Sequence, residues 1–250
     1  MEQDRPTLSR RSLLASGVLA LLAPQVARAD GDRGHRPVIE APHLSEDPTA
    51  VPVQVSVDHP MEPDHYIRAL EVRLDQDPVP YKGTFLFTPA NGEAGVAFHM
   101  RSGAGGTLTA VAECSRHGRF STSRQIRVAD GGCTTAPDAS SRTGGNPRIR
   151  LPRSIRPGEV VQVRIKIDHD SYTGLVMRDG RIVEAAPGFY VKQVLIYFDD
   201  QQVSEFQLTS AISANPLLRF PLKAMRSGTL RVVFVNSEEQ RWETSERLRL

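Results

Sequence analysis

The sequence is poor in cysteine and in aromatic side chains, with two cysteines and 6% aromatic residues among 250. Two cysteines cannot build a four-cysteine zinc or iron–sulfur site, nor the framework of a disulfide-rich miniprotein. Long apolar runs are also missing. The longest, residues 13–23, is eleven residues interrupted by Ser16 and Gly17, whereas a helix needs about 20 to cross a bilayer. We therefore expect no membrane-spanning segment.

An excess of charge of one sign is lacking as well. Lysine and arginine number 31 and the acidic residues 29. The small positive excess lies in the first 29 residues, so the remaining 221 residues carry 27 charges of each sign. A nucleic-acid-binding protein needs a basic surface. The composition therefore argues against a nucleic-acid partner.

Catalytic and cofactor motifs are absent too. The sequence has no G-x-S-x-G elbow, no H-E-x-x-H and no glycine-rich phosphate loop after a strand. We therefore expect no catalytic centre of its own and no bound cofactor. His59 and His65 flank Met61, which raises the possibility of a copper site. A surface loop joining two strands explains these residues as well, and we favour it, so no metal is expected.

The first 29 residues have the features of an export signal. Arg10 and Arg11 directly precede the apolar run, and Ala27-Arg28-Ala29 has the small residues of an A-x-A cleavage site. Paired arginines before a weakly apolar core indicate the twin-arginine route. An ordinary secretory signal or an uncleaved anchor is the alternative. The sequence therefore predicts a protein of the periplasm, an oxidising compartment.

The rest of the chain is predominantly strand-forming sequence. Residues 38–130 alternate apolar and polar positions in short runs separated by turn signals, a pattern typical of antiparallel sandwiches. These runs are residues 51–57, 70–74, 85–87, 96–100, 108–114 and 120–128. Similar runs resume within residues 147–250, including a small hairpin around Asp179-Gly180. The prediction is an all-β fold with two antiparallel β-sandwich domains.

Residues 131–146 separate these domains. They are mainly Gly, Ser, Thr, Ala, Pro and Asp, a composition that cannot bury much apolar surface. We expect a flexible linker there. Cys133 lies near its start, directly after Gly131 and Gly132, which lack a Cβ and so give the arm flexibility. An exposed thiol of this kind can enter a narrow pocket of another protein, but it is also open to oxidants.

A disulfide between Cys133 and Cys114 is the opposing interpretation, and it is the usual one for two cysteines in an exported chain. The spacing argues against it. If residues 107–114 and 120–128 form a hairpin, Val128 lies about 26 Å along the sheet from Cys114. The five residues from Val128 to Cys133 span at most about 18 Å. We therefore favour a mobile functional thiol at Cys133 over a disulfide or an incidental cysteine. Cys114 shares the alternation of the inward-facing residues, and its role stays open.

The two halves resemble the SoxY and SoxZ parts of the SoxYZ sulfur carriers. The SoxY-like match covers residues 38–130 and the arm, and the SoxZ-like match covers residues 147–250. The most specific signal is the run from Ala211 to Pro216, Ala-Ile-Ser-Ala-Asn-Pro. Further matching segments are residues 53–61, 66–68, 77–80, 85–89, 131–133, 157–161 and 227–229.

This resemblance implies two paired immunoglobulin-like domains and a cysteine that carries sulfur intermediates covalently, at the position of Cys133. It also implies periplasmic redox enzymes as partners, which load and unload the thiol. The chain departs from the family in two ways: threonines, not glycines, follow the cysteine, and the arm continues into the second domain. Fused chains of this kind resemble the carriers associated with quinoprotein dehydrogenases, so a c-type cytochrome or quinoprotein dehydrogenase system is the expected partner. The alternative is a non-catalytic tandem-sandwich accessory protein of such a dehydrogenase.

Overall fold

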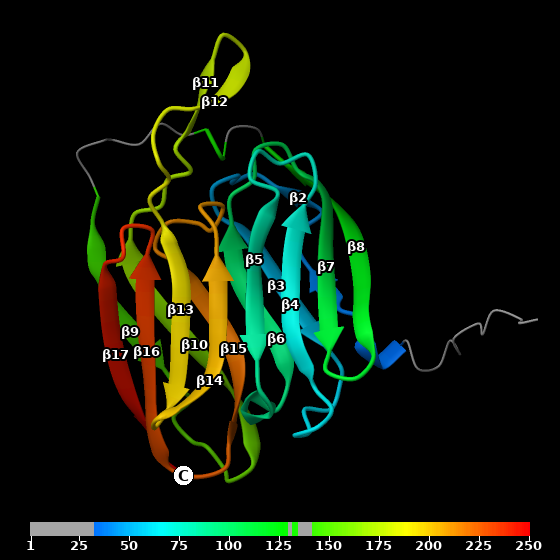
Figure 1. Ribbon diagram of the computed structural model, residues 1–250, viewed down its shortest axis with the longest axis vertical. Coiled ribbons are helices and arrows are strands. Elements are labelled where there is room, and N and C mark those ends of the chain that lie inside the picture. Colours follow the sequence, from blue (N-terminus) through cyan, green and yellow to red (C-terminus); the bar gives the residue numbers. More distant parts are fainter. Residues whose placement is uncertain (1–32, 130–131, 135–141) are drawn as a thin grey trace, which may run out of the picture.

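The computed structural model describes residues 33–129, 132–134 and 142–250. The predicted signal segment, residues 1–29, and Gly131 lie outside the described residues. The regular structure that is described is almost entirely β-strand (Figure 1). Short 3-10 turns occur at Arg33–His35 (η1) and Pro89–Asn91 (η2). None of the described helices is long or apolar enough to span a membrane.

The strands of the first half agree closely with the predicted alternation. They are β1 (Val38–Glu40), β2 (Leu44–Ser45), β3 (Val51–Val57), β4 (Ile67–Leu74), β5 (Tyr81–Phe87), β6 (Ala94–Met100), β7 (Gly106–Cys114) and β8 (Gly118–Val128). Those of the second half are β9 (Gly144–Arg150), β10 (Glu159–His169), β11 (Leu175–Arg178), β12 (Arg181–Glu184), β13 (Val191–Phe198), β14 (Gln201–Leu208), β15 (Leu217–Ala224), β16 (Gly228–Asn236) and β17 (Arg241–Leu248).

Two large sheets face each other, and each contains strands of both halves. One has the order β1-β3-β6-β15-β10-β9, and the other has the order β17-β16-β13-β14-β5-β4-β7-β8-β2. The halves join where β5 pairs with β14 and β6 pairs with β15, both antiparallel. Figure 1 shows the nine-stranded sheet in front and the six-stranded sheet behind it. The prediction of an all-β fold with two antiparallel sandwich domains is confirmed, and the domains pair edge to edge.

A single hydrophobic core fills the space between the sheets. In β3 the valines at positions 51, 53, 55 and 57 are buried, and the residues between them are more exposed. Phe85 and Phe206 come from different halves, yet their ring centroids lie 5.3 Å apart. One continuous cluster of buried side chains contains residues of both halves. Burial of this apolar surface is the main force that holds the halves together.

The predicted linker, residues 131–146, needs correction at both ends. β9 already begins at Gly144, so the last three residues of that range belong to a sheet edge. At the other end, residues 132–134 are described and Cys133 is buried. Residues 135–141 lie outside the described residues. The polar composition of this range did not predict either end. Residues 144–146 are held by backbone pairing and Cys133 by a polar pocket, and neither depends on apolar side chains.

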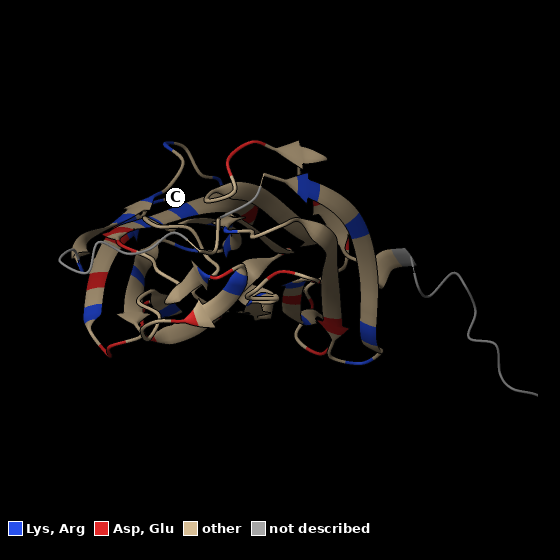
Figure 2. Ribbon diagram, turned by 90° about the horizontal axis from the view of Figure 1, so that it is seen from above, with Lys and Arg blue, Asp and Glu red and all other residues tan. Residues whose placement is uncertain are grey.

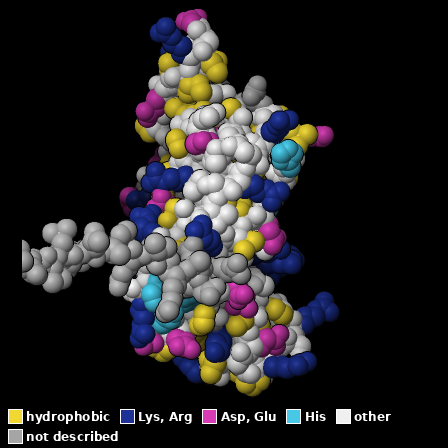
Figure 3. Space-filling view, turned by 90° about the vertical axis from the view of Figure 1, so that its right-hand side faces the viewer, with side chains coloured by type: hydrophobic (Ala, Val, Ile, Leu, Met, Phe, Trp, Pro, Cys, Tyr) yellow, Lys and Arg dark blue, Asp and Glu magenta, His cyan; other side chains and the backbone are white. Residues whose placement is uncertain are grey.

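A small hairpin, β11 and β12, projects from one end of the second half (Figure 1). Asp179 and Gly180 both have positive φ, 50° and 73°, as a type I′ turn requires. The predicted hairpin is therefore confirmed. Met177 and Ile182 are exposed on it, and hydrophobic atoms gather at this end of the molecule in Figure 3.

Charged residues of both signs are interspersed over the two layers in Figure 2, in keeping with the balanced charge.

Candidate functional site

Cys133 lies in a buried polar pocket where the two halves meet. Its side chain is 1% exposed, so the expectation of an exposed thiol is wrong for this conformation. The physical reason is that the pocket supplies partners that a sequence composition does not reveal. Cys133 Sγ lies 3.3 Å from Asp77 Oδ1 and donates a hydrogen bond to it. Asp77 is on the β4–β5 loop, where the sequence showed only a turn signal.

Lys82 completes the charged part of the pocket. Its side chain and that of Asp77 are both fully buried, and Lys82 Nζ lies 3.0 Å from Asp77 Oδ1. The same ammonium donates to the carbonyls of Val79, at 2.9 Å, and Arg101, at 3.1 Å. All three ammonium protons thus have a partner, which a buried charge needs if it is not to destabilise the fold.

Arg101 adds a second buried cation beside the thiol. Its guanidinium donates to the carbonyl of Gly132 at 3.3 Å and to that of Ser171 at 2.7 Å. Among the described residues, its Nε has no hydrogen-bond partner. Lys82 and Arg101 are cations and Asp77 is an anion, so these three side chains around the thiol carry one net positive charge.

Burial raises the pKa of the Cys133 thiol to about 12, and the nearby Asp77 carboxylate adds to this effect. Lys82 and Arg101 act in the opposite direction but do not outweigh burial. Burial likewise lowers the pKa of Lys82. Because only the thiolate is nucleophilic, the docked thiol is protonated and unreactive near neutral pH.

Backbone contacts hold the arm in this pocket. Thr173 Oγ1, from the second half, donates to the Cys133 carbonyl at 2.5 Å. A Cβ on Gly132 would collide with the carbonyl oxygens of Pro48 and Ser102. Glycine is required here for close approach, in addition to any flexibility that it gives the arm. Gly132 thus lets the backbone before Cys133 lie against the carbonyls of Pro48 and Ser102.

The run 211–216, which the sequence singled out, lies directly behind this pocket. The amide of Arg101 donates to the Ala211 carbonyl at 2.6 Å, and the Ser213 amide donates to the His99 carbonyl at 3.1 Å. Ser171 Oγ donates to the carbonyl of Ile212 at 2.8 Å. These bonds fix the end of β6 and the loop after β10 relative to each other. The signature run of the second half therefore positions the pocket of the first.

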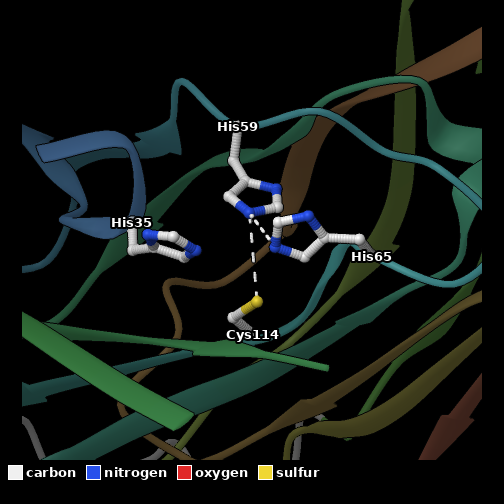
Figure 4. A group of neighbouring side chains, drawn as sticks. All are labelled: His35, His59, His65 and Cys114. Atoms are coloured by element: carbon white, nitrogen blue, oxygen red, sulfur yellow. Dashed lines mark hydrogen bonds between the residues drawn. The ribbon is translucent and has the colours of Figure 1, made fainter. Parts of the chain in front are cut away.

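A second cluster of chemically reactive side chains lies at the other end of the first half. His35, His59, His65 and Cys114 each offer one donor atom, and these four atoms lie within 4.8 Å of one another. Figure 4 shows the three rings and the sulfur around a common centre. His35 comes from η1, His59 and His65 from the β3–β4 loop, and Cys114 from the end of β7.

His117, on the β7–β8 turn, borders this cluster. Its Nδ1 lies 3.0 Å from His35 Nε2, 3.1 Å from His65 Nε2 and 3.6 Å from Cys114 Sγ. Burial lowers the pKa of His59 despite a hydrogen bond to the carbonyl of Pro60. The favoured interpretation of His59 and His65 as ordinary loop residues missed this assembly. The spacing Cys114-x-x-His117 beside His59-x5-His65 was the available signal, whereas His35 joins only through the fold.

The two cysteines are both free and buried, so the prediction that they do not form a disulfide is confirmed. The predicted hairpin that supports it is also present, with Cys114 opposite Gly118 and Leu108 opposite Arg124. Cys114 is 2% exposed, as its alternation indicated. β4 separates the two sites: Ile67 lies beside Cys114, and Leu74 precedes the loop with Asp77. Ile67 and Leu74 are seven residue steps apart, about 23 Å of strand, so the two sites lie toward opposite ends of β4.

Fold and site define a class of protein: a fused pair of β-sandwich domains that shelters one cysteine of an interdomain arm at their junction. Family comparison agrees with this class. Residues 19–133 match the model for sulfur oxidation protein SoxY, and residues 149–247 match that for sulphur oxidation protein SoxZ. The chain belongs to the SoxYZ sulfur-carrier family, with SoxY and SoxZ fused in one polypeptide. This membership supports a carrier role in sulfur oxidation.

No curated protein matched the chain. Among solved structures, superoxide reductase (neelaredoxin) from Ignicoccus hospitalis is 32% identical over 38% of this chain and 81% of its own, with a TM-score of 0.35. A putative superoxide reductase from Thermotoga maritima is 29% identical over 39% of this chain and 88% of its own, with a TM-score of 0.35. A β-glycosidase from Bacteroides vulgatus is 10% identical over 85% of this chain and 24% of its own, with a TM-score of 0.26. With TM-scores this low, these likenesses support no conclusion about function.

Proposed function

We propose that the protein carries a sulfur intermediate covalently on Cys133 and alternates between a docked and a released arm. The observation that supports this proposal best is the built pocket around the thiol. Asp77, Lys82 and Arg101 are all buried there, and desolvating three charged groups is costly unless their positions are used.

The docked arm protects the thiol, and the released arm exposes it. In the pocket, burial keeps Cys133 protonated and out of reach of oxidants. After release, the pKa of the thiol returns toward its ordinary value, and the thiolate becomes available for loading.

Loading forms a bond between Cys133 Sγ and a sulfur atom of the cargo. When the cargo is thiosulfate, formation of this bond removes two electrons and releases the proton of Cys133; when the cargo is a thiol, it removes two electrons and releases the protons of both thiols. The partner redox enzyme takes up these electrons, in a c-type cytochrome or quinoprotein dehydrogenase system. The carrier itself needs no catalytic centre for this exchange.

We place the protein in the periplasm, on the basis of the twin arginines and the A-x-A spacing in residues 1–29.

An arm joined to strands at both ends presents Cys133 as a loop, since β8 ends at Val128 and β9 begins at Gly144. A partner cleft must therefore admit two chain segments, which favours partners different from those of carriers with a terminal arm.

Polysulfide loading of the reduced protein tests the proposal without a partner enzyme. A thiolate attacks the protonated terminal sulfur of a hydropolysulfide, the adjacent S–S bond breaks, and a polysulfide one sulfur shorter leaves, so no outside oxidant is needed. We expect one persulfide per chain, found by peptide mass mapping on Cys133, and none in Cys133→Ser. A persulfide on Cys114 instead, or equal loading of Cys133→Ser, would contradict the proposal.

A further inference from the structure

We propose that His35, His59, His65, Cys114 and His117 form a binding site for one first-row transition-metal ion. The site lies at the end of the first half opposite the Cys133 pocket and is a second function of the chain beyond sulfur carriage. Its donors come from three separate segments that only the fold brings together. Figure 4 shows four of these side chains directed at one point.

The distances between the donor atoms match those around a single ion. Two imidazole nitrogens, each about 2.1 Å from one metal and about 90° apart, are separated by about 3.0 Å. The structure has 3.0 Å between His35 Nε2 and His117 Nδ1, and 3.1 Å for each of the pairs His65–His117 and His59–His65.

The thiol fits the same centre. A thiolate sulfur about 2.3 Å from the metal lies about 3.1 Å from a nitrogen at an angle of about 90°, and about 3.8 Å at about 120°. Cys114 Sγ is 3.6 Å from His117 Nδ1 and 3.9 Å from His59 Nε2. The donor atoms of His35, His59, His65 and Cys114 lie within 4.8 Å of one another and suit one coordination sphere, and His117 Nδ1 lies close enough to three of them to serve as a fifth donor.

Hydrogen bonds alone cannot satisfy all the contacts between these histidine nitrogens well. The Nδ1 of His59 lies 2.5 Å from the Pro60 carbonyl, which can only accept, so Nδ1 carries the proton and Nε2 presents its lone pair to the cluster. His65 Nε2 must then donate its one proton toward both His59 and His117. His117 Nδ1 must accept from both His65 and His35. When His35 and His65 carry their protons on Nδ1 instead, all four nitrogens present lone pairs, and one cation satisfies them at once; the carbonyl that orients His59 acts as an outer-sphere partner typical of metal sites.

The donor set indicates the class of metal. Imidazole suits Fe, Co, Ni, Cu and Zn, and thiolate favours the softer of these, whereas Mg²⁺ and Ca²⁺ need oxygen donors. Five donors exceed the four of a structural zinc site, which favours an ion that accepts five or six ligands. His35 stacks on Phe120, with ring centroids 4.7 Å apart, which holds the His35 ring in position. His117 is exposed and His65 half-buried, and histidine atoms reach the surface in the lower part of Figure 3.

Cobalt(II) titration of the reduced full chain tests this site. We expect one Co²⁺ per chain and a near-ultraviolet absorption band from thiolate-to-cobalt charge transfer. Cys114→Ser should abolish this band, and alanine at His59, His65 or His117 should weaken Co²⁺ binding by at least about tenfold. Excess Mg²⁺ or Ca²⁺ should not displace the cobalt.

Two control variants test whether Co²⁺ binds at this cluster or at any histidine or cysteine of the chain. His43 is exposed and outside the cluster, and Cys133 lies in the other pocket, so His43→Ala and Cys133→Ser should leave Co²⁺ affinity and the band unchanged. Circular dichroism checks the fold of each variant, and His65→Gln replaces His65→Ala if the latter unfolds. Absence of Co²⁺ binding, or a band that survives Cys114→Ser, would overturn the proposal. A band lost in Cys133→Ser would overturn it as well.

Discussion

Cys133 illustrates how one side chain depends on its neighbours. On composition it belongs to an exposed arm, yet Asp77, Thr173 and the tight fit of Gly132 hold it in a pocket. In the proposed cycle, the same thiol is protonated and buried in the docked state and becomes a nucleophile in the released state. Substitution of Gly132 and the pH dependence of thiol reactivity distinguish the two states.

Gly132→Ala should release the arm. The added Cβ collides with backbone oxygens of Pro48 and Ser102, and backbone cannot give way as a flexible side chain can. We expect Cys133 of the folded variant to react with a maleimide at least about a hundredfold faster than in the parent protein. Thermal unfolding should change little, because few apolar contacts are lost. Equal reaction rates in the two proteins would show that Gly132 does not control docking.

The raised pKa of Cys133 sets how its alkylation by maleimide should change with pH. Ionisation of Cys133 opposes docking, so docking is fully stable below the ordinary thiol pKa of 9.0 and is lost as the pH rises toward about 12. Near pH 8 the docked thiol holds about a thousandfold less thiolate than a free one. Alkylation of the parent protein should therefore rise steeply above pH 9, while Gly132→Ala should titrate near 9. Superimposed pH profiles would show that docking does not set the reactivity of the thiol.

Among the secondary-structure elements, strands were predictable where one face is buried. Alternation predicts β3 and β7 because every second residue enters the core. It does not predict that β5 pairs with β14, since pairing between distant segments depends on edges that the pattern does not specify. The sites obey the same rule. Cys133 was found from its glycine neighbours, whereas Lys82 and His35 acquire their roles through contacts between distant segments.

The β5–β14 seam yields a stability prediction. Phe206 is fully buried there, and its ring lies 5.3 Å from Phe85 and 5.4 Å from Phe220. Phe206→Ala should lower the free energy of unfolding by about 3–5 kcal/mol, because it leaves a cavity that close-packed strands cannot fill. Denaturant titration measures this loss. Gln202→Ala, an exposed position of the same strand, should stay within about 0.5 kcal/mol of the parent.

The two halves are built into one structural unit. Sheets and core run through both halves, so unfolding should be a single cooperative transition. Expressed separately, residues 33–129 and 142–250 should associate in solution, because each alone exposes the apolar edge of the seam. Analytical ultracentrifugation at micromolar concentration checks this. Two halves that remain monomeric when mixed would contradict the paired architecture.

Peptide mass mapping of protein purified from its native host, with thiols blocked at lysis, tests the carrier function most directly. We expect a sulfur-containing adduct on the peptide with Cys133, present in cells that oxidise sulfur compounds and reduced in cells that do not. No such adduct is expected on the peptide with Cys114, which is buried at the end of β7 and is not part of the arm. An unmodified Cys133 under both growth conditions would contradict the carrier function.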